Sequence, residues 1–268
     1  MRLVTYDRRG HRRLGAILGG EVVDLPDVVG HPAFPTTLEA LVSSSGGTVM
    51  DAARAALERE DEVARCVVKQ ARVLPPLFPT SLLTPDALGV ERRIVGPEQD
   101  VPWPDGAAWI DHEPKVAAVL ARETAQASLE DIPPNIFGYT LVSDWTAHEA
   151  SGDPLATADG LPLAIGPCVV TADELDPQTM VVQVKVDGEE IAKGNLNGAA
   201  ESLYDLITEA SRFAVLERGD AFALGPFGRA DLDPSRRLWP GALIELAAEG
   251  IGTLRNRIGL ARSHGSAV

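Results

Sequence analysis

MVVQVKVDGEEIAKG, residues 180–194, is the stretch of sequence that decides the fold. Its valines at alternate positions are separated by polar residues as far as the pair Asp187-Gly188. Such alternation is typical of a strand with one buried and one wet face, and Asp-Gly is a favoured two-residue hairpin turn. The stretch therefore predicts a β-hairpin that covers an apolar core.

Other short apolar segments that predict strands occur at close spacing along the chain. VAAVLA, FGYTLVSDW and ALIELAAEGIGTLRNRIG occupy residues 116–121, 137–145 and 242–259. A helix fits residues 199–213, because its apolar side chains fall on one side at helical spacing. We therefore expect an α+β fold, in which one or two helices pack on a rolled or sandwiched β structure.

The first part of the chain has a different pattern. Residues 2–26 predict a small strand meander, and residues 37–41 and 49–63 predict helices. For the second helix we expect a buried face of Ala52, Ala53, Ala56, Leu57 and Val63. The proline-rich LPPLFP at 74–79 then predicts a domain boundary. We expect a small N-terminal α/β domain over residues 1–75 and a second, larger domain over residues 76–268.

Charge and cysteine content narrow the class of protein. The net charge is −15, which opposes binding to nucleic acid or to anionic lipid. Cys66 and Cys168 have neither disulfide-framework nor zinc-site spacing, so any metal is expected on oxygen ligands. Charged residues come early in the chain and no long apolar run follows, so we expect no signal peptide and no membrane span. We expect a soluble, cytoplasmic protein.

Several segments in order resemble the fumarylacetoacetate hydrolase family. They are DHE at 111–113, GYTLVSDWTAHE at 138–149, GPCVVTADEL at 166–175, VDGEEIAKGNLNG at 186–198, SRFAVLERGDAFALGP at 211–226 and EGIGTLRNRIG at 249–259. The resemblance implies a mixed β-roll or β-sandwich core, a homodimer, and an active site for a small-molecule oxo-acid or β-diketone. Family members commonly hold one Mg²⁺ or Ca²⁺ through an E-x-E pair and a later Asp. A hard cation on carboxylates can stabilise the enolate of such a substrate.

The sequence departs from this pattern at the metal site. The pair reads Glu113-Pro114-Lys115, so an amine replaces the second carboxylate, while Asp144 takes the position of the third ligand. Unit charges 4 Å apart interact by about 4 kcal/mol at an effective dielectric constant of about 20, so the ammonium would repel a divalent ion. We predict no cofactor, or a weakly held Mg²⁺ or Ca²⁺ on Glu113 and Asp144. Lys115 is then either a fixed cation that stabilises an enolate or part of a salt bridge that fills an inactivated site.

The positions of the histidines also differ from the pattern of the family. The family's lid histidine has no counterpart in residues 84–100, which offer Glu91 and Glu98 but no histidine. His148 stands where the family places an arginine, and it is either a proton shuttle in the same cavity or a structural histidine. His112 should point to the opposite face of its strand from Glu113. Structural roles are expected for Tyr139, Trp145 and Cys168, which lie in apolar runs, and for Arg255 and Arg257, as ion-paired scaffold in the closing strand.

Three functions follow, with Lys115, His148, Glu113 and Asp144 as the candidate catalytic residues. The first is C–C bond hydrolysis of an enolisable oxo-acid or β-dicarbonyl compound through an enolate, the most frequent activity of the family. The second is a metal-independent isomerase, lyase, cyclase or decarboxylase of a biosynthetic pathway, which needs no activated water. The third is a catalytically silent homologue that binds a small acid or a partner protein.

Overall fold

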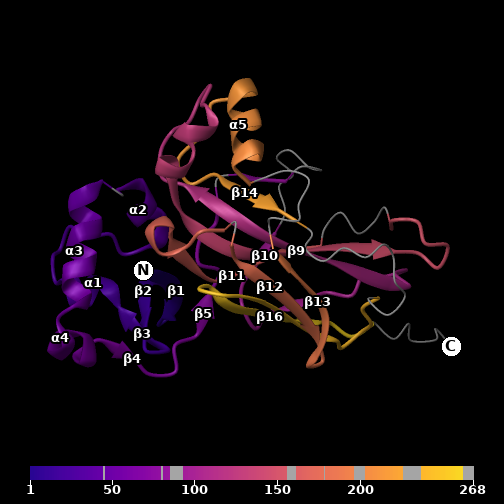
Figure 1. Cartoon of the computed structure of the whole chain (residues 1–268). Coiled ribbons are helices and arrows are strands. Elements are labelled where there is room, and N and C mark those ends of the chain that lie inside the picture. The colour runs from indigo at the N-terminus through magenta and orange to yellow at the C-terminus, as the bar shows by residue number, and fades with distance from the viewer. Residues whose placement is uncertain are drawn as a thin grey trace.

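A computed structural model describes residues 1–44, 46–79, 81–84, 93–155, 161–177, 179–195, 203–225 and 237–261 of the chain. Two β-sheets form its centre, and most of its helices lie to one side of them, beside the N-terminal strands (Figure 1). Helix α5 lies apart from the other helices, near strand β14. No helix in these ranges is long and apolar enough to cross a membrane.

The larger sheet has eleven strands and carries both the N-terminal meander and the central strands. Its main path runs β4-β3-β2-β1-β11-β10-β9-β14-β6, with β5 paired to β1 and β7 paired to β11. The strands span Arg2–Arg8 (β1), His11–Leu18 (β2), Glu21–Asp24 (β3), Val67–Val68 (β4), Val73–Leu74 (β5), Leu82–Leu83 (β6), Ile94–Val95 (β7), Trp109–Leu120 (β9), Ile136–His148 (β10), Leu163–Thr171 (β11) and Ala221–Leu224 (β14).

The smaller sheet contains the hairpin predicted from residues 180–194. Its order is β13-β12-β15-β16-β8, with bounds Glu189–Asn195, Val181–Val186, Leu243–Ala248, Gly252–Ile258 and Asp100–Val101. Val182, Val184 and Val186 are all buried, which confirms the alternation. Asp187 and Gly188 both have positive φ angles, 48° and 89°, as the tight hairpin turn requires.

The helices match the predictions in part. They span Leu25–Val29 (α1), Leu38–Ser43 (α2), Gly47–Leu57 (α3), Glu60–Arg65 (α4) and Leu203–Phe213 (α5), with 3₁₀ turns at Leu129–Asp131 (η1), Pro133–Asn135 (η2) and Ala172–Glu174 (η4). Helix α5 buries Leu203, Leu206 and Ile207 as predicted, and residues 199–202 of that prediction lie outside the described residues.

The single helix predicted over residues 49–63 is wrong, because the chain breaks between α3 and α4. Arg59 leaves the helical region, with ψ at 86°, and its guanidinium donates a hydrogen bond to the carbonyl of Val28 in α1. This contact outside the helix stabilises the break. The expected buried face is wrong at Ala52, which is exposed, while Ala53 and Ala56 are buried.

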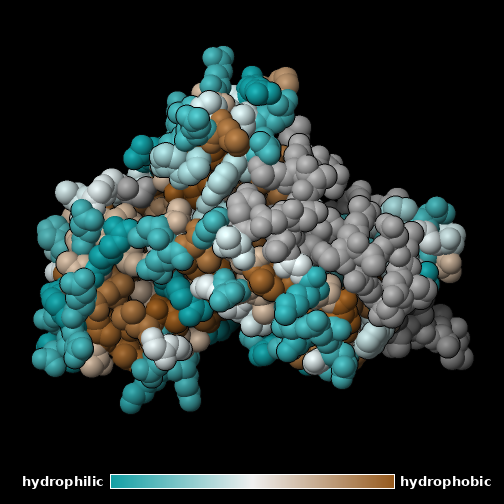
Figure 2. Space-filling view, in the orientation of Figure 1, coloured by the Kyte–Doolittle hydropathy of each residue, from teal (hydrophilic) through white to brown (hydrophobic). Residues whose placement is uncertain are grey.

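The main hydrophobic core lies between the two sheets. It joins Leu141 and Trp145 of β10 to Leu246 of β15 and Ile258 of β16. This confirms the α+β class with a mixed, sandwiched β core. Strand β1 pairs with β11, so one sheet crosses the domain boundary predicted at residue 75, and the division into two domains stays a prediction. Figure 2 shows a mainly hydrophilic surface with hydrophobic residues visible over the N-terminal strands.

Candidate active site

Strands β9 and β10 bring the predicted acidic residues together. In this antiparallel pair Glu113 lies opposite Asp144, and Lys115 lies opposite Val142. Residues two apart in a strand share a face, so Glu113, Lys115 and Asp144 project from the same side of the sheet. The segment DHE at 111–113 lies inside β9, before the apolar stretch 116–121.

Lys115 forms ion pairs with both carboxylates. Its Nζ lies 2.7 Å from Oδ2 of Asp144 and 3.1 Å from Oε2 of Glu113. The residue is only 2% exposed. A charge so deeply buried needs close counter-charges to offset the loss of its hydration, and the two carboxylates supply them.

Hydrogen-bond donors on β10 bind the other oxygen of each carboxylate. The hydroxyl of Thr146 donates to Oε1 of Glu113 at 2.9 Å, and the backbone N–H of Trp145 donates to Oδ1 of Asp144 at 2.7 Å. Each carboxylate therefore turns its other oxygen towards Lys115. We call Glu113, Lys115 and Asp144 the ammonium cluster.

Gly225 packs directly against the stem of Lys115. It follows β14, which pairs with β9 from Ala221 to Leu224. A Cβ atom at residue 225 would lie 2.3 Å from the carbonyl oxygen of Pro114 and 2.8 Å from Cγ of Lys115. Only glycine fits this approach without displacing its neighbours.

The ammonium cluster does not fit a divalent cation. Its Nζ lies within hydrogen-bond distance of both carboxylates, where a cation shared by them would bind. Within the described ranges, no group of three or more His, Cys, Asp or Glu side chains is arranged to hold a metal. Two carboxylates and one ammonium carry a net charge of −1, the same as three carboxylates with one divalent ion. The ammonium of Lys115 thus occupies the position between the two carboxylates.

His148 lies on the same face, further along the strand pair. Its ring stacks on Trp109, with centroids 3.8 Å apart and planes 7° apart, and its Nδ1 lies 3.1 Å from the carbonyl oxygen of Gly152. The guanidinium carbon of Arg237 lies 4.7 Å from the centroid of the Trp109 ring. The structure records no contact between His148 and the ammonium cluster, and its role in proton transfer stays a prediction.

His112 points to the other face, as expected. Its Nε2 lies 2.9 Å from the hydroxyl of Ser143, and its ring stacks on Trp145 at 4.7 Å. Burial lowers the pKa of His112 to about 3, with a further lowering by Lys115 that the carboxylate of Asp144 opposes. His112 is therefore a neutral structural group behind the site.

The remaining candidates have scaffold contacts. Glu98 lies 3.4 Å from the guanidinium of Arg255, which also pairs with Glu245, while Glu91 lies outside the described residues. Arg257 donates to the carbonyl of Gly241 rather than pairing with an acid in the described part of the chain. Tyr139 and Cys168 are buried, and burial raises the pKa of the Cys168 thiol. Both cysteines are free.

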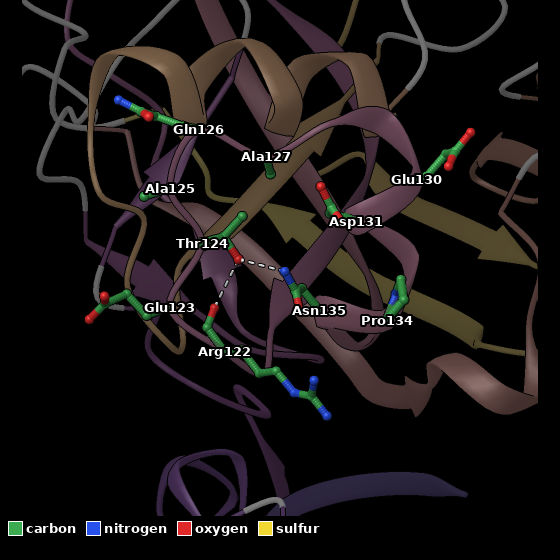
Figure 3. Close-up of a pocket in the computed structure, with 10 residues that line it drawn as sticks. All are labelled: Arg122, Glu123, Thr124, Ala125, Gln126, Ala127, Glu130, Asp131, Pro134 and Asn135. Atoms are coloured by element: carbon green, nitrogen blue, oxygen red, sulfur yellow. Dashed lines mark hydrogen bonds between the residues drawn. The ribbon is translucent and has the colours of Figure 1, made fainter.

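A surface pocket of about 370 Å³ lies elsewhere (Figure 3). It is formed after the end of β9 by residues 122–127, 130–131 and 134–135. At its base the amide of Asn135 donates to Thr124 Oγ1 at 3.2 Å, and that hydroxyl donates to the Arg122 carbonyl at 3.1 Å. Its lining excludes every residue of the ammonium cluster, so it does not define the candidate site.

Residues 48–259 match the family model described as "Fumarylacetoacetate (FAA) hydrolase C-terminal". This match covers more than half of the chain. The chain therefore belongs to the fumarylacetoacetate hydrolase family, a family of enzymes.

Individual relatives are distant. Oxaloacetate tautomerase YisK of Bacillus subtilis is 31% identical over 161 residues, 56% of this chain and 52% of that protein, so the chain spans about half of its length. The uncharacterized protein PYRAB13970 of Pyrococcus abyssi is 29% identical over 193 residues, 69% of this chain and 81% of that protein.

Solved structures share the fold across almost the whole chain. A fumarylacetoacetate hydrolase of Exiguobacterium antarcticum has a TM-score of 0.78 at 21% identity, covering 97% of this chain and 100% of that one. Maleylpyruvate hydrolase of Sphingobium sp. SYK-6, in complex with manganese(II) and pyruvate, has a TM-score of 0.76 at 21% identity, covering 98% and 100%. At such identities the likeness concerns the fold.

The structure adds residues that the sequence analysis did not select. Thr146 belongs to the quoted DWTAHE segment, and strand alternation with the pairing of Glu113 and Asp144 would have placed it beside Glu113. Gly225 belongs to the quoted segment SRFAVLERGDAFALGP, and its contact with Lys115 gave no signal in the sequence. Trp109 and Arg237 had no sequence signal, because their contact joins distant segments.

Proposed function

We propose that this enzyme isomerises an enolisable 2-oxo acid or β-dicarbonyl compound by proton transfer through an enolate. Lys115 is the cation that stabilises the enolate oxygen, in place of the family's divalent ion. The observation that supports this most is the ammonium held between Glu113 and Asp144.

Among the described residues, the contacts of the Lys115 ammonium leave one N–H donor for substrate. A lysine side chain carries three N–H donors, and two of them point to the carboxylates of the cluster. The third can donate to a carbonyl oxygen, and that bond strengthens as negative charge develops on the oxygen. Fixed donors of this kind stabilise transition states because they need no reorganisation during the reaction.

Glu113 is the proposed base. Its side chain is 26% exposed, against 11% for Asp144, so substrate reaches it more easily. Its carboxylate takes the proton from the carbon next to the carbonyl, and the C–H electron pair moves into the enolate. The same proton is then delivered to the enolate oxygen, which gives the enol, or to a different carbon of a conjugated enolate, which gives the isomer, so nothing is consumed.

C–C bond hydrolysis is the second candidate, and the fold shared with maleylpyruvate hydrolase is what favours it. Hydrolysis also passes through an enolate, but it needs a base for water. The lid glutamate within the described residues, Glu98, pairs with Arg255 instead. This contact favours isomerisation over hydrolysis.

Two assays test these functions. Loss of the enol absorbance of oxaloacetate measures tautomerisation, and pyruvate release from acylpyruvates measures hydrolysis. We expect tautomerisation, and a loss of about 10²–10³-fold in kcat for Lys115→Met, the usual effect of removing one oxyanion donor. Lys193→Met, which removes an exposed lysine on β13, is the matched control.

Each alternative has its own outcome. Pyruvate release that depends on Lys115 would support hydrolysis. Turnover that is equal in the wild type and Lys115→Met would contradict the proposal. No turnover of any oxo-acid by the wild type would support the silent binding homologue. The homodimer implied by the family stays a prediction, which the mass in solution tests.

A further inference from the structure

A second surface pocket, of about 360 Å³, borders the turn between β1 and β2. Its described lining consists of four arginines, one histidine and one threonine, namely Arg8, Arg9, His11, Arg12, Arg13 and Thr36, and contains no acidic side chain. Residue 36 lies beside β2, because its carbonyl accepts a hydrogen bond from the N–H of Leu14 at 2.8 Å. The pocket therefore gathers positive charge on a chain whose net charge is −15.

Three of the arginines form ion pairs with acids that do not line the pocket. The pairs are Arg8 and Arg13 with Asp24 and Asp27, and Arg12 with Glu39. In these pairs Arg8 uses only its Nη1 and Arg12 only its Nη2. A guanidinium has five N–H donors, so the pairs fix the side chains and leave donors for a further anion.

Arg9 and His11 have no hydrogen-bond or ion-pair partner among the described residues, and both are exposed. Arg9 has a φ angle of 57° and Gly10 one of 83°, a turn conformation in which Asn is favoured over a long side chain. His11 lies directly opposite Arg8 in the strand pair, so its imidazole offers an N–H donor beside that guanidinium. These two side chains add donors that no acid in the described part of the chain uses.

Phosphate groups match these donors. The planar guanidinium fork binds phosphate oxygens through two parallel N–H···O bonds, and several forks around one pocket suit an anion with more than one phosphate group. A compact anion meets only the basic lining of the pocket. An extended polyanion would also meet the acidic remainder of the chain, which repels it. The charge distribution therefore favours a small polyphosphate over nucleic acid or an anionic lipid surface.

We infer that the pocket beside the β1–β2 turn binds a small polyphosphate anion. Arg9 and His11 bind the anion directly, and the ion-paired arginines of the lining donate to it from fixed positions. The lining includes no residue of the ammonium cluster, so this site is separate from the candidate active site and does not depend on the proposed function.

Calorimetry with pyrophosphate as the probe tests the inference. We expect the wild type to bind one pyrophosphate per chain. Arg9→Asn and His11→Ala should each weaken binding about tenfold, the usual loss when a hydrogen bond to a charged group is removed. Because asparagine is favoured at a positive φ, Arg9→Asn removes the guanidinium and keeps the turn. Arg65→Gln, at an exposed arginine on α4, loses the same charge and should bind like the wild type.

Other outcomes would overturn the inference. One is that the wild type does not bind pyrophosphate. Another is an equal loss in Arg9→Asn and Arg65→Gln, because a general attraction by positive charge gives that pattern. Lys115→Met should bind pyrophosphate like the wild type, and a loss in this variant would place the anion at the ammonium cluster instead. Binding to duplex DNA or to vesicles of anionic phospholipid, without binding to pyrophosphate, would contradict a small ligand.

Discussion

Gly225 sets the position of the Lys115 side chain, because a Cβ atom at residue 225 would lie 2.8 Å from Lys115 Cγ. We predict that Gly225→Ala displaces the ammonium and lowers kcat by about 10–100-fold, since a shift of about 1 Å in a catalytic group has effects of this size. Steady-state kinetics measure the loss. Gly47→Ala in α3, where the nearest atom to the added Cβ is 3.9 Å away, is the control. Unchanged kcat in Gly225→Ala would contradict this account of the glycine.

The residue at position 115 is predicted to decide whether the chain holds a metal. Lys115→Glu removes the ammonium and supplies a third carboxylate, which together leave a site of hard oxygen ligands. We expect this variant to bind one Mn²⁺ per chain, detected as a loss of the free-ion signal in electron paramagnetic resonance. Lys115→Gln, which removes the charge without adding a ligand, should bind more weakly. Tight Mn²⁺ binding by the wild-type protein would show that the lysine does not exclude the ion.

His112 is predicted to lower stability in acid. Its pKa is about 3 in the folded protein, against about 6.5 for the unperturbed side chain. Between these values the unfolded chain binds a proton that the folded protein does not, so the free energy of unfolding falls as pH falls. The slope from this residue approaches about 1.4 kcal/mol per pH unit. Urea unfolding of the wild type and His112→Phe from pH 7 to 4 measures it. Parallel curves for the two proteins would argue against a buried neutral histidine.

Asp24 is predicted to be the main polar stabiliser of the N-terminal strands. This 3% exposed residue accepts hydrogen bonds from the hydroxyl of Tyr6 and from the guanidinium groups of Arg8 and Arg13. Burial raises the pKa of Asp24, but the bonds from Arg13 and Tyr6 outweigh it and hold the pKa below its usual value. The contribution of ionised Asp24 to the free energy of unfolding is therefore present at neutral pH. It is lost as the pH falls through the pKa that Asp24 has in the folded protein.

Asp24→Asn should lower the free energy of unfolding at pH 7 by about 2 kcal/mol, because it removes the buried charged acceptor that Tyr6, Arg8 and Arg13 share, although Asp27 still pairs with both arginines. Asp51→Asn, at an exposed pair with Arg54, should change it by less than about 0.5 kcal/mol. Urea titrations compare the two variants. Similar small effects would mean that the network around Asp24 contributes little.

The fold was predictable wherever local patterning and burial agree. The alternating valines before Asp187-Gly188 predicted both the strands and the turn. The break at Arg59 was not predictable, because it depends on a bond to Val28 in another helix. Helical periodicity alone carries no information on such a contact.

The candidate site, too, could be predicted from the sequence only in part. Strand periodicity places Glu113 and Lys115 on one face, and the family resemblance adds Asp144, so the ammonium cluster could be predicted from the sequence. The stack of Trp109 and His148 with Arg237 could not. It depends on Trp109 lying opposite His148 and on Arg237 arriving from a segment more than one hundred residues later.

The pairing of β1 with β11 joins Arg2 to Val170 and Leu3 to Val169. During synthesis, the edge of β1 that pairs with β11 therefore stays unpaired until β11 has left the ribosome. Contacts so distant along the chain slow folding and leave an open strand edge in the meantime. A nascent chain cut before residue 163 would expose that edge, so chaperone dependence should be concentrated in this interval of translation.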